Sequence, residues 1–498
     1  MSYINRTSII FKPVALFSLA FVFLIGCGGG SSKSGSGYIH LYNASSNAPD
    51  VYLTLDEDIT EDDDDEFETT YAGVGYADAS GNYEVDAEEY YIELAWQDED
   101  SNDRDDLEKV YEDKIEITED NIHYVIVTED FSSPKILNFT VELIDDDNDS
   151  DEDLFNLRVL NLHSVASSVD IYLSKSDQSF NEATLISNSN YQEMSENQKF
   201  DQDDYVFYIT EAGSSEVLFQ TEEVSYNYPS QYLMVIRENN GVDSSPYVLD
   251  KISNSNIETF EHDGAQASFR VFNAINEHQL LPNYQGEFNL YLNGVDETPE
   301  ITELKLGEFS DTTTTDHGDY SVDLTIPTTG ETIIKNHLLT LTENQNKTVF
   351  FYIKEEDVDE DGDGDVDEDG DGYVDEIEIT TNSLVVTNST SESIYDNDIQ
   401  IIHFVDNEDF SSVTFYFVRS DEIIETANYK KSVQLASPEE ITLINNTYTV
   451  YAVAKEDSSD IILTTTTLTL TEDSDNLFLL LEQDNDSPTG YSILTVAQ

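Results

Sequence analysis

Hydrophobic and polar residues alternate over short stretches of the chain, and this pattern predicts β-strands. Residues 320–326 (YSVDLTI) are typical, because apolar and polar side chains take turns, as in a strand with one buried face. Residues 124–127 and 349–353 are instead hydrophobic at every position. The chain contains 30 Tyr and 24 Phe, which favour strands over helices. We therefore expect an all-β protein.

The same order of predicted strands recurs about four times. Each copy opens with a strand, a turn and a second strand, and these openings lie at 39–53, 157–173, 269–292 and 399–417. A strand led by tyrosine follows in the middle of each copy, at Tyr90, Tyr205, Tyr320 and Tyr448. A short strand, a strongly apolar strand and a closing strand complete the copy. Roughly seven strands in about 110 residues are typical of an immunoglobulin-like β-sandwich.

Repeats of this length are whole domains in series rather than solenoid units. We expect four tandem β-sandwich modules, numbered 1 to 4, at 38–144, 155–253, 267–388 and 399–498. The predicted linkers at 145–153, 254–266 and 388–398 are polar, and two of them are conspicuously acidic.

The first 26 residues have the features of a signal peptide. Arg6 and Lys12 precede an apolar run from Val14 to Ile25, which is too short to span a membrane comfortably. Residues 24–27 (LIGC) resemble the bacterial lipoprotein box. That resemblance implies cleavage before Cys27, lipid on its thiol and usually a further acyl chain on its amine. The alternative is an ordinary signal peptide followed by a chance cysteine.

Residues 27–37 are the predicted lipidated cysteine and a Gly/Ser tether, which composition makes flexible. Gly28 follows the cysteine, and within the resemblance a residue other than Asp favours delivery to the outer membrane. We therefore expect a protein anchored in the outer membrane by lipid, on its periplasmic or extracellular face.

The charge is extreme: 21 basic and 105 acidic residues give a net charge of −84. Nucleic acids are excluded as partners, because binding to phosphates needs Lys and Arg to displace counterions. The same charge destabilises a compact fold unless salt or divalent cations screen it. We therefore expect the folded protein in saline or calcium-containing surroundings.

The opening strands resemble the bacterial domain of unknown function 4397. Residues 157–173 (LRVLNLHSVASSVDIYL) match its pattern at Arg158, Asn161, Val169, Asp170 and Tyr172. The other copies keep parts of the pattern, and each departs from it somewhere. The resemblance covers most of residues 38–498 and implies immunoglobulin-like sandwiches in an exported, often lipid-anchored protein. The family has no established enzymatic role, so the resemblance implies architecture and location only.

One acidic stretch, 357–376 (DVDEDGDGDVDEDGDGYVDE), has the spacing of calcium ligands. A twelve-residue calcium loop needs glycine at its sixth position and glutamate at its twelfth. Two overlapping registers, 357–368 and 365–376, meet both requirements. The candidate ligands are Asp357, Asp359, Asp361, Asp363, Asp365, Asp367, Glu368, Asp369, Asp371 and Glu376.

Both flanks of this stretch have strand patterns, so it resembles the calcium-binding repeats of thrombospondin type 3 more than a helix–loop–helix sensor. Its place in the repeat predicts a hairpin between the last two strands of module 3. Ca²⁺ would fold the loop and stiffen the joint to module 4; the alternative is a solvated acidic loop. The clusters at 56–66, 98–106 and 145–153 lack the glycine and a closing glutamate at the proper spacing, so we interpret them as solvated surface.

No candidate catalytic constellation emerges from the sequence, and we expect no enzymatic activity. With a single cysteine the chain has neither an internal disulfide nor a thiolate cluster. His40 and His123 fall in predicted strands, His403 is predicted to be a turn or core residue, and Trp96 is predicted to face a core. The leading hypothesis is a structural or adhesive surface protein held by lipid on Cys27 and stabilised by Ca²⁺. The alternative is a lipoprotein that binds a surface glycan or peptide, the partner being a carbohydrate or a protein.

Overall fold

The fold is all-β, as the sequence predicts. The computed structural model describes residues 35–57, 67–98, 101, 104–144, 154–295, 298–358, 376–407, 410, 412–456 and 459–498. Helical structure in these ranges is confined to three single-turn 3-10 helices: η1 (Arg104–Asp106), η2 (Phe180–Glu182) and η3 (Ile424–Thr426). A search of this part of the chain finds no helix long and apolar enough to cross a membrane. The predicted signal peptide, Cys27 and most of the tether lie outside it.

The strands form four groups, one per module. Module 1 contains β1 (Ser36–Asn43), β2 (Tyr52–Asp56), β3 (Glu68–Thr70), β4 (Tyr83–Asp86), β5 (Glu89–Trp96), β6 (Glu108–Glu116), β7 (Asn121–Thr128) and β8 (Lys135–Glu142). Module 2 contains β9 (Leu154–Asn161), β10 (Ser168–Lys175), β11 (Thr184–Asn190), β12 (Gln198–Asp201), β13 (Asp204–Glu211), β14 (Val217–Gln220), β15 (Val224–Ser225), β16 (Gln231–Glu238), β17 (Tyr247–Ile252) and β18 (Ile257–Phe260).

The second half of the chain repeats this series. Module 3 contains β19 (Gln266–Ala274), β20 (Glu287–Leu292), β21 (Ile301–Lys305), β22 (Thr313–Asp316), β23 (Gly318–Thr325), β24 (Thr332–Leu341), β25 (Asn346–Asp357) and β26 (Ile377–Thr387). Module 4 contains β27 (Asp396–His403), β28 (Ser412–Val418), β29 (Tyr429–Gln434), β30 (Glu439–Ile444), β31 (Thr447–Glu456), β32 (Ser459–Thr469), β33 (Leu477–Gln483) and β34 (Tyr491–Ala497).

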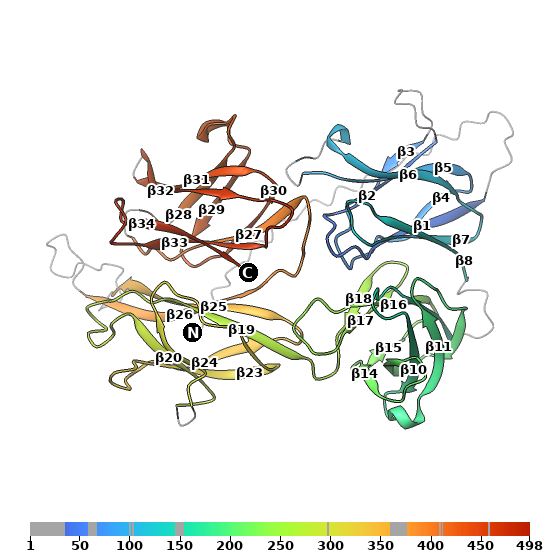
Figure 1. Cartoon of the computed structure of the whole chain (residues 1–498), viewed down its shortest axis with the longest axis horizontal. Helices are drawn as coiled ribbons and strands as arrows, with labels where there is room; N and C mark the ends of the chain where they lie inside the picture. The colour runs from blue at the N-terminus through green and yellow to red at the C-terminus, as the bar shows by residue number, and fades with distance from the viewer. Residues whose placement is uncertain are drawn as a thin grey trace, which may run out of the picture. The chain divides into compact units, whose positions relative to one another are not determined.

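Each module is a sandwich of two sheets with the same strand order (Figure 1). The sheet that contains the first strand, here called the first sheet, has the orders β4-β1-β7-β8, β12-β9-β16-β17-β18, β22-β19-β25-β26 and β30-β27-β33-β34. The second sheets are β3-β2-β5-β6, β11-β10-β13-β14 with β15 beside β13, β21-β20-β23-β24 and β29-β28-β31-β32. In every first sheet one pair is parallel: β1 with β7, β9 with β16, β19 with β25 and β27 with β33.

Within the described residues, modules 1, 3 and 4 have eight strands each, one more than the seven or so predicted from the sequence. Module 2 has ten, because β15 and β18 are added. The strand β18 lies within the stretch 254–266 predicted as a linker, and it pairs with β17 from Leu249↔Phe260 to Ile252↔Ile257. At the N-terminal end, β1 begins at Ser36, two residues before the predicted start of module 1.

The tyrosine that leads the middle strand makes the same hydrogen bond in every module. Its hydroxyl donates to the backbone carbonyl oxygen four residues earlier, at 3.2 Å for Tyr90, 2.7 Å for Tyr205, 2.6 Å for Tyr320 and 2.8 Å for Tyr448. The tyrosine corner of immunoglobulin-like sandwiches ties a strand to the preceding turn by a comparable bond. The repeated tyrosine is therefore a structural residue of the fold.

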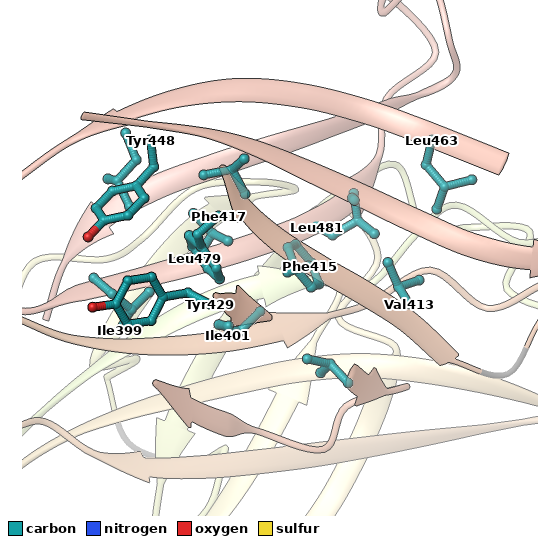
Figure 2. Close-up of a cluster of buried hydrophobic side chains, with 14 of the residues drawn as sticks. Ile399, Ile401, Val413, Phe415, Phe417, Tyr429, Tyr448, Leu463, Leu479 and Leu481 are labelled. Atoms are coloured by element: carbon teal, nitrogen blue, oxygen red, sulfur yellow. The ribbon is translucent and has the colours of Figure 1, made fainter. Parts of the chain in front are cut away.

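A separate hydrophobic core fills each sandwich. Figure 2 shows that of module 4, where Phe415, Phe417 and Tyr448 of the second sheet face Ile401, Leu479 and Leu481 of the first. All six side chains are fully buried. Alternate residues of each strand point inward, which accounts for the period of two in the sequence.

The outer faces of the first sheets are buried as well. In β16, Met234 and Ile236 belong to the core of module 2, whereas Leu233 and Val235 belong to a cluster shared with module 1. That cluster also contains Tyr42, Ile122, Tyr124 and Ile126 from β1 and β7. Strands buried on both faces are hydrophobic throughout, so this packing explains why these stretches do not alternate. We call this contact the 1–2 interface.

Modules 3 and 4 pack together in the same way. Phe272, Phe350 and Val386 of module 3 share a buried cluster with Ile402, Phe404, Phe478 and Leu480 of module 4. We call this contact the 3–4 interface. The sequence predicts modules in series, whereas the structure adds two face-to-face contacts between neighbouring modules.

Candidate functional site

The predicted calcium stretch is closed at its base by strand pairing. Asp357 ends β25 and pairs with Ile377, the first residue of β26, and the Val358 N–H donates to the Glu376 carbonyl oxygen at 3.0 Å. The two ends of the stretch therefore meet at a hairpin, at the position expected from the repeat. The side chains of Asp357 and Glu376 are exposed. The other candidate ligands, Asp359, Asp361, Asp363, Asp365, Asp367, Glu368, Asp369 and Asp371, lie outside the described residues.

Asparagines of the opening motif stabilise the loop that follows the first strand. Asn43, Asn161 and Asn273 are fully buried, and the side-chain oxygen of each accepts the N–H of the residue two positions later. Their amide groups donate to backbone carbonyl oxygens such as those of Val74, Ser189 and Leu304. These residues therefore hold the loop to the opposite sheet, which is a structural role.

A buried charged cluster lies in the 1–2 interface. Asp250 of β17 is 0% exposed and accepts hydrogen bonds on both oxygens. Arg237 donates through Nε at 2.7 Å and Nη2 at 3.3 Å, and Thr259 donates through Oγ1 at 2.8 Å. The fourth donor comes from module 1: the Tyr42 hydroxyl lies 2.6 Å from Oδ2 of Asp250. Four donors satisfy the acceptor capacity of a carboxylate.

A second tyrosine of module 1 completes this cluster. The Arg237 guanidinium lies over the Tyr76 ring, 5.6 Å from its centroid, and the Tyr76 hydroxyl accepts a hydrogen bond from Asn240 at 3.1 Å. Burial and then Asp250 raise the pKa of Tyr42 well above its usual value. Burial is the largest single influence on Arg237 and opposes its charge, but Asp250 and the neighbouring tyrosines together outweigh it, so the pKa of Arg237 is raised. The cluster therefore consists of a buried Arg237–Asp250 ion pair and two tyrosines whose pKa is raised.

Sequence reasoning missed this cluster, although a signal was present. Residues 247–252 (YVLDKI) form an apolar strand interrupted by Asp250 and Lys251. Charged residues are rarely fully buried unless they are paired. An acid in a strand of this kind therefore indicates a buried partner, but only the fold shows that Arg237 and Tyr42 supply it.

Trp96 packs into a core, as predicted, and it also borders a polar cavity. Its ring is stacked on Tyr395, with centroids 4.3 Å apart and planes 3° apart, and it is only 8% exposed. Beside it is a cavity of about 790 Å³ whose lining includes Asp98, Asp106, Glu108 and Asn428. The volume is in the range of small-ligand sites, and the lining suits a ligand rich in hydroxyl groups.

The three histidines named from the sequence are buried: His40 and His123 lie in strands, as predicted, and His403 is the last residue of β27. His40, His123 and His403 are exposed by 1%, 4% and 0%. His40 contacts Asn82, with Nδ1 2.6 Å from its side-chain oxygen, and His123 contacts Thr118. His40 and His123 therefore contact side chains of their own module. A search of the described residues finds no group of three or more His, Cys, Asp or Glu side chains arranged to hold a metal ion.

Comparisons with known proteins add little to these observations. No family model matches the chain, and no curated protein matches it. The Bacillus anthracis TIE protein aligns at 8% identity and a TM-score of 0.14, covering 91% of this chain and 75% of that chain. BcpA, the major pilin subunit of Bacillus cereus, aligns at 8% identity and a TM-score of 0.14, covering 66% of this chain and 99% of that chain.

A third solved structure, the product complex of SpuA, is described as a multi-modular glycogen-degrading pneumococcal virulence factor. It aligns at 9% identity and a TM-score of 0.13, covering 63% of this chain and 38% of that chain. At these TM-scores the matches carry no argument about function. The description of each module as a sandwich rests on the strand pairing given above.

Proposed function

We propose that this protein is a structural or adhesive surface protein, held in the outer membrane by lipid on Cys27. The observation that carries the structural part is the burial of each first sheet on both faces. Shared clusters such as that of Tyr42, Tyr124 and Val235 couple neighbouring modules into stiff pairs. A stiff body projecting from a membrane suits mechanical or adhesive work better than a flexible string of domains. No catalytic step is part of the proposal.

The proposed lipid anchor and the proposed calcium site rest on the sequence. Residues 24–27 supply the lipoprotein-box resemblance, and residues 357–376 supply two calcium-loop registers. The hairpin base between Asp357 and Ile377 supports the calcium site, because it holds the two ends of the acidic stretch together. Bound Ca²⁺ would then offset some of the repulsion within a chain of net charge −84.

Replacement of the lipidated cysteine tests the anchor. We expect Cys27→Ser to move the protein from the membrane fraction to the soluble fraction with its β-sheet circular dichroism unchanged. Gly28→Asp is the matched variant: it keeps the cysteine and should redirect the protein from the outer to the inner membrane. If Cys27→Ser stays in the membrane fraction, the lipid anchor is wrong. Loss of cell attachment to surfaces in Cys27→Ser, with equal expression, would support adhesion.

The cavity beside Trp96 favours a second candidate function, the binding of a carbohydrate or peptide. Its polar lining by Asp98, Asp106 and Asn428 suits hydrogen bonding to sugar hydroxyl groups. A glycan array and a peptide pull-down on the soluble protein test it. A defined ligand whose affinity falls in Asn428→Ala would favour this function over a purely structural one.

A further inference from the structure

Asp250 occupies a position that leucine occupies in the other three modules. In the first sheets, Asp250 pairs with Val235, Leu137 with Ile126, Leu384 with Phe350 and Leu494 with Leu480. The partners Val235, Ile126, Phe350 and Leu480 occupy equivalent positions. Each lies on the strand that runs parallel to the first strand of its module, and each pairs with the residue just before the buried Asn or His at the end of that first strand. All four positions belong to the outer face that contacts a neighbouring module.

The group that meets Asp250 across the interface is also unique to its module. Tyr42 is equivalent to Leu160, Phe272 and Ile402, none of which carries a hydrogen-bond donor in its side chain. Arg237 is likewise equivalent to Thr128, Tyr352 and Glu482, so only module 2 places a cation here. The acid, its cation and the tyrosine that joins them are therefore exclusive to modules 1 and 2.

The 3–4 interface shows what a first sheet without these groups offers instead. Phe272, Phe350 and Phe478 form its centre, and Leu384 and Leu494 pack in or against the same cluster. The Arg270 guanidinium of module 3 lies over the rings of Phe309 and Phe478, at 4.7 and 5.7 Å from their centroids, and donates to the Ala497 carbonyl oxygen of module 4. The Phe and Leu side chains of this cluster offer no acceptor to the Tyr42 hydroxyl and no donor to replace it at Asp250. An unmatched buried polar group is costly.

We propose that Asp250, with Arg237 and Tyr42, determines which modules pair: it makes the first sheet of module 2 accept that of module 1 and reject those of modules 3 and 4. The same selection applies between molecules, which matters where many copies share one membrane. Buried polar groups in coiled coils fix partner and register by the same principle, at some cost in stability. The three residues are therefore determinants of specificity, and the apolar residues around them supply most of the binding.

A disulfide across the 1–2 interface measures correct pairing in the full chain. Asn82 and Asn254 suit this purpose, because the backbone N–H of Asn82 donates to the Asn254 carbonyl oxygen at 3.1 Å and their side chains are also hydrogen-bonded. The background is Cys27→Ser, since Cys27 is the only natural cysteine. Asn82→Cys with Asn254→Cys is unfolded, refolded and oxidised, and the yields of intramolecular and intermolecular disulfide are measured.

The test variant makes the cluster apolar: Tyr42→Phe, Arg237→Met and Asp250→Leu together. We expect it to melt at an equal or higher temperature, because apolar replacement of a buried ion pair is often neutral or stabilising. Its yield of the correct disulfide should nevertheless fall about threefold or more, with intermolecular products rising. A role in stability alone would not produce this combination. The matched control removes a tyrosine hydroxyl, a cation and an acid in the second sheet of module 4: Tyr416→Phe, Lys431→Met and Asp460→Leu.

The outcome that overturns the proposal is a triple variant that folds and forms the correct disulfide as efficiently as the parent. If the triple variant does not fold, Tyr42→Phe alone decides the question, because it removes only the hydroxyl that joins the modules. We expect a measurable fall in correct disulfide yield for Tyr42→Phe and none for Tyr416→Phe. Equal yields in these two variants would also overturn the proposal.

Discussion

At the residue scale, the end of the first strand shows how one position sets the chemistry of each module. Asn43, Asn161 and Asn273 bind backbone groups there, whereas module 4 has His403. Burial lowers the pKa of His403 to about 4, and its backbone contacts with Val433 and Val405 offset this only in part. Module 4 alone therefore has a group of low pKa at this structural position.

This difference predicts that acid destabilises module 4 through His403. Above about pH 6.5 the ring is neutral in both the folded and the unfolded state, so it adds no pH dependence. Between about pH 6.5 and 4 only the unfolded state takes up the proton, so stability falls as the pH falls, by roughly 3 kcal/mol in all. We expect His403→Asn to remove this slope, measured as the difference in denaturant unfolding between variant and parent at each pH. Parallel pH profiles for the two proteins would contradict the prediction.

A second prediction at the residue scale concerns the buried asparagines at the ends of the first strands. Asn273→Ala leaves the Leu304 and Gly286 carbonyl oxygens and the Ile275 N–H without their buried partner. We expect a loss of about 2 kcal/mol or more in the free energy of unfolding of module 3, measured by denaturant unfolding. Asn283→Ala is the control, because its amide makes an exposed hydrogen bond to Glu331, and it should cost less than about 0.5 kcal/mol. Equal effects of the two variants would refute the structural role.

At the element scale, the sequence was sufficient to predict the strands but not which strands pair with each other. Alternation in 320–326 predicts a strand, and the repeated tyrosine predicts its place in each module, because both depend on local sequence. The parallel pairing of β1 with β7 joins residues about 80 positions apart, and no local pattern specifies it. The strand β18 was predicted as linker because 254–266 is polar, yet its backbone completes a sheet beside β17. The sequence likewise does not show that Val235 is buried against module 1, since a run of apolar residues does not specify what it packs against.

The prediction at the element scale concerns Ca²⁺ binding at the hairpin between β25 and β26. We expect millimolar Ca²⁺ to raise the melting temperature of module 3 in the mature protein, and a chelator to reverse the effect, because the carboxylates of 357–376 repel one another without a cation. Glu368→Gln with Glu376→Gln replaces the bidentate glutamate at the twelfth position of both registers and should abolish the shift. Asp473→Asn with Asp475→Asn removes the same charge from an exposed loop of module 4 and should preserve it. If both pairs of variants respond to Ca²⁺ like the parent, the stretch is a solvated acidic loop.

At the scale of the whole molecule, the interfaces decide how many units unfold independently. The apolar faces of β7 and β16 bury residues such as Ile126 and Val235 against each other, so each module supplies part of its neighbour's covering. Removal of this covering exposes large apolar side chains to water, at roughly 25 cal/mol per Å². Damage to one face of the 1–2 interface should therefore weaken both modules that share it.

Val235→Asp tests this coupling between modules. The variant places a carboxylate in the fully buried 1–2 interface, which should cost on the order of 3 kcal/mol or more. We expect hydrogen exchange to accelerate in the strands of modules 1 and 2 together, while modules 3 and 4 keep the protection of the parent protein. Thr467→Asp, on the exposed outer face of β32, is the control and should leave all four modules unchanged. A shared interface would transmit the loss of stability from module 2 to module 1. Faster exchange confined to module 2 would therefore show that the two modules unfold separately.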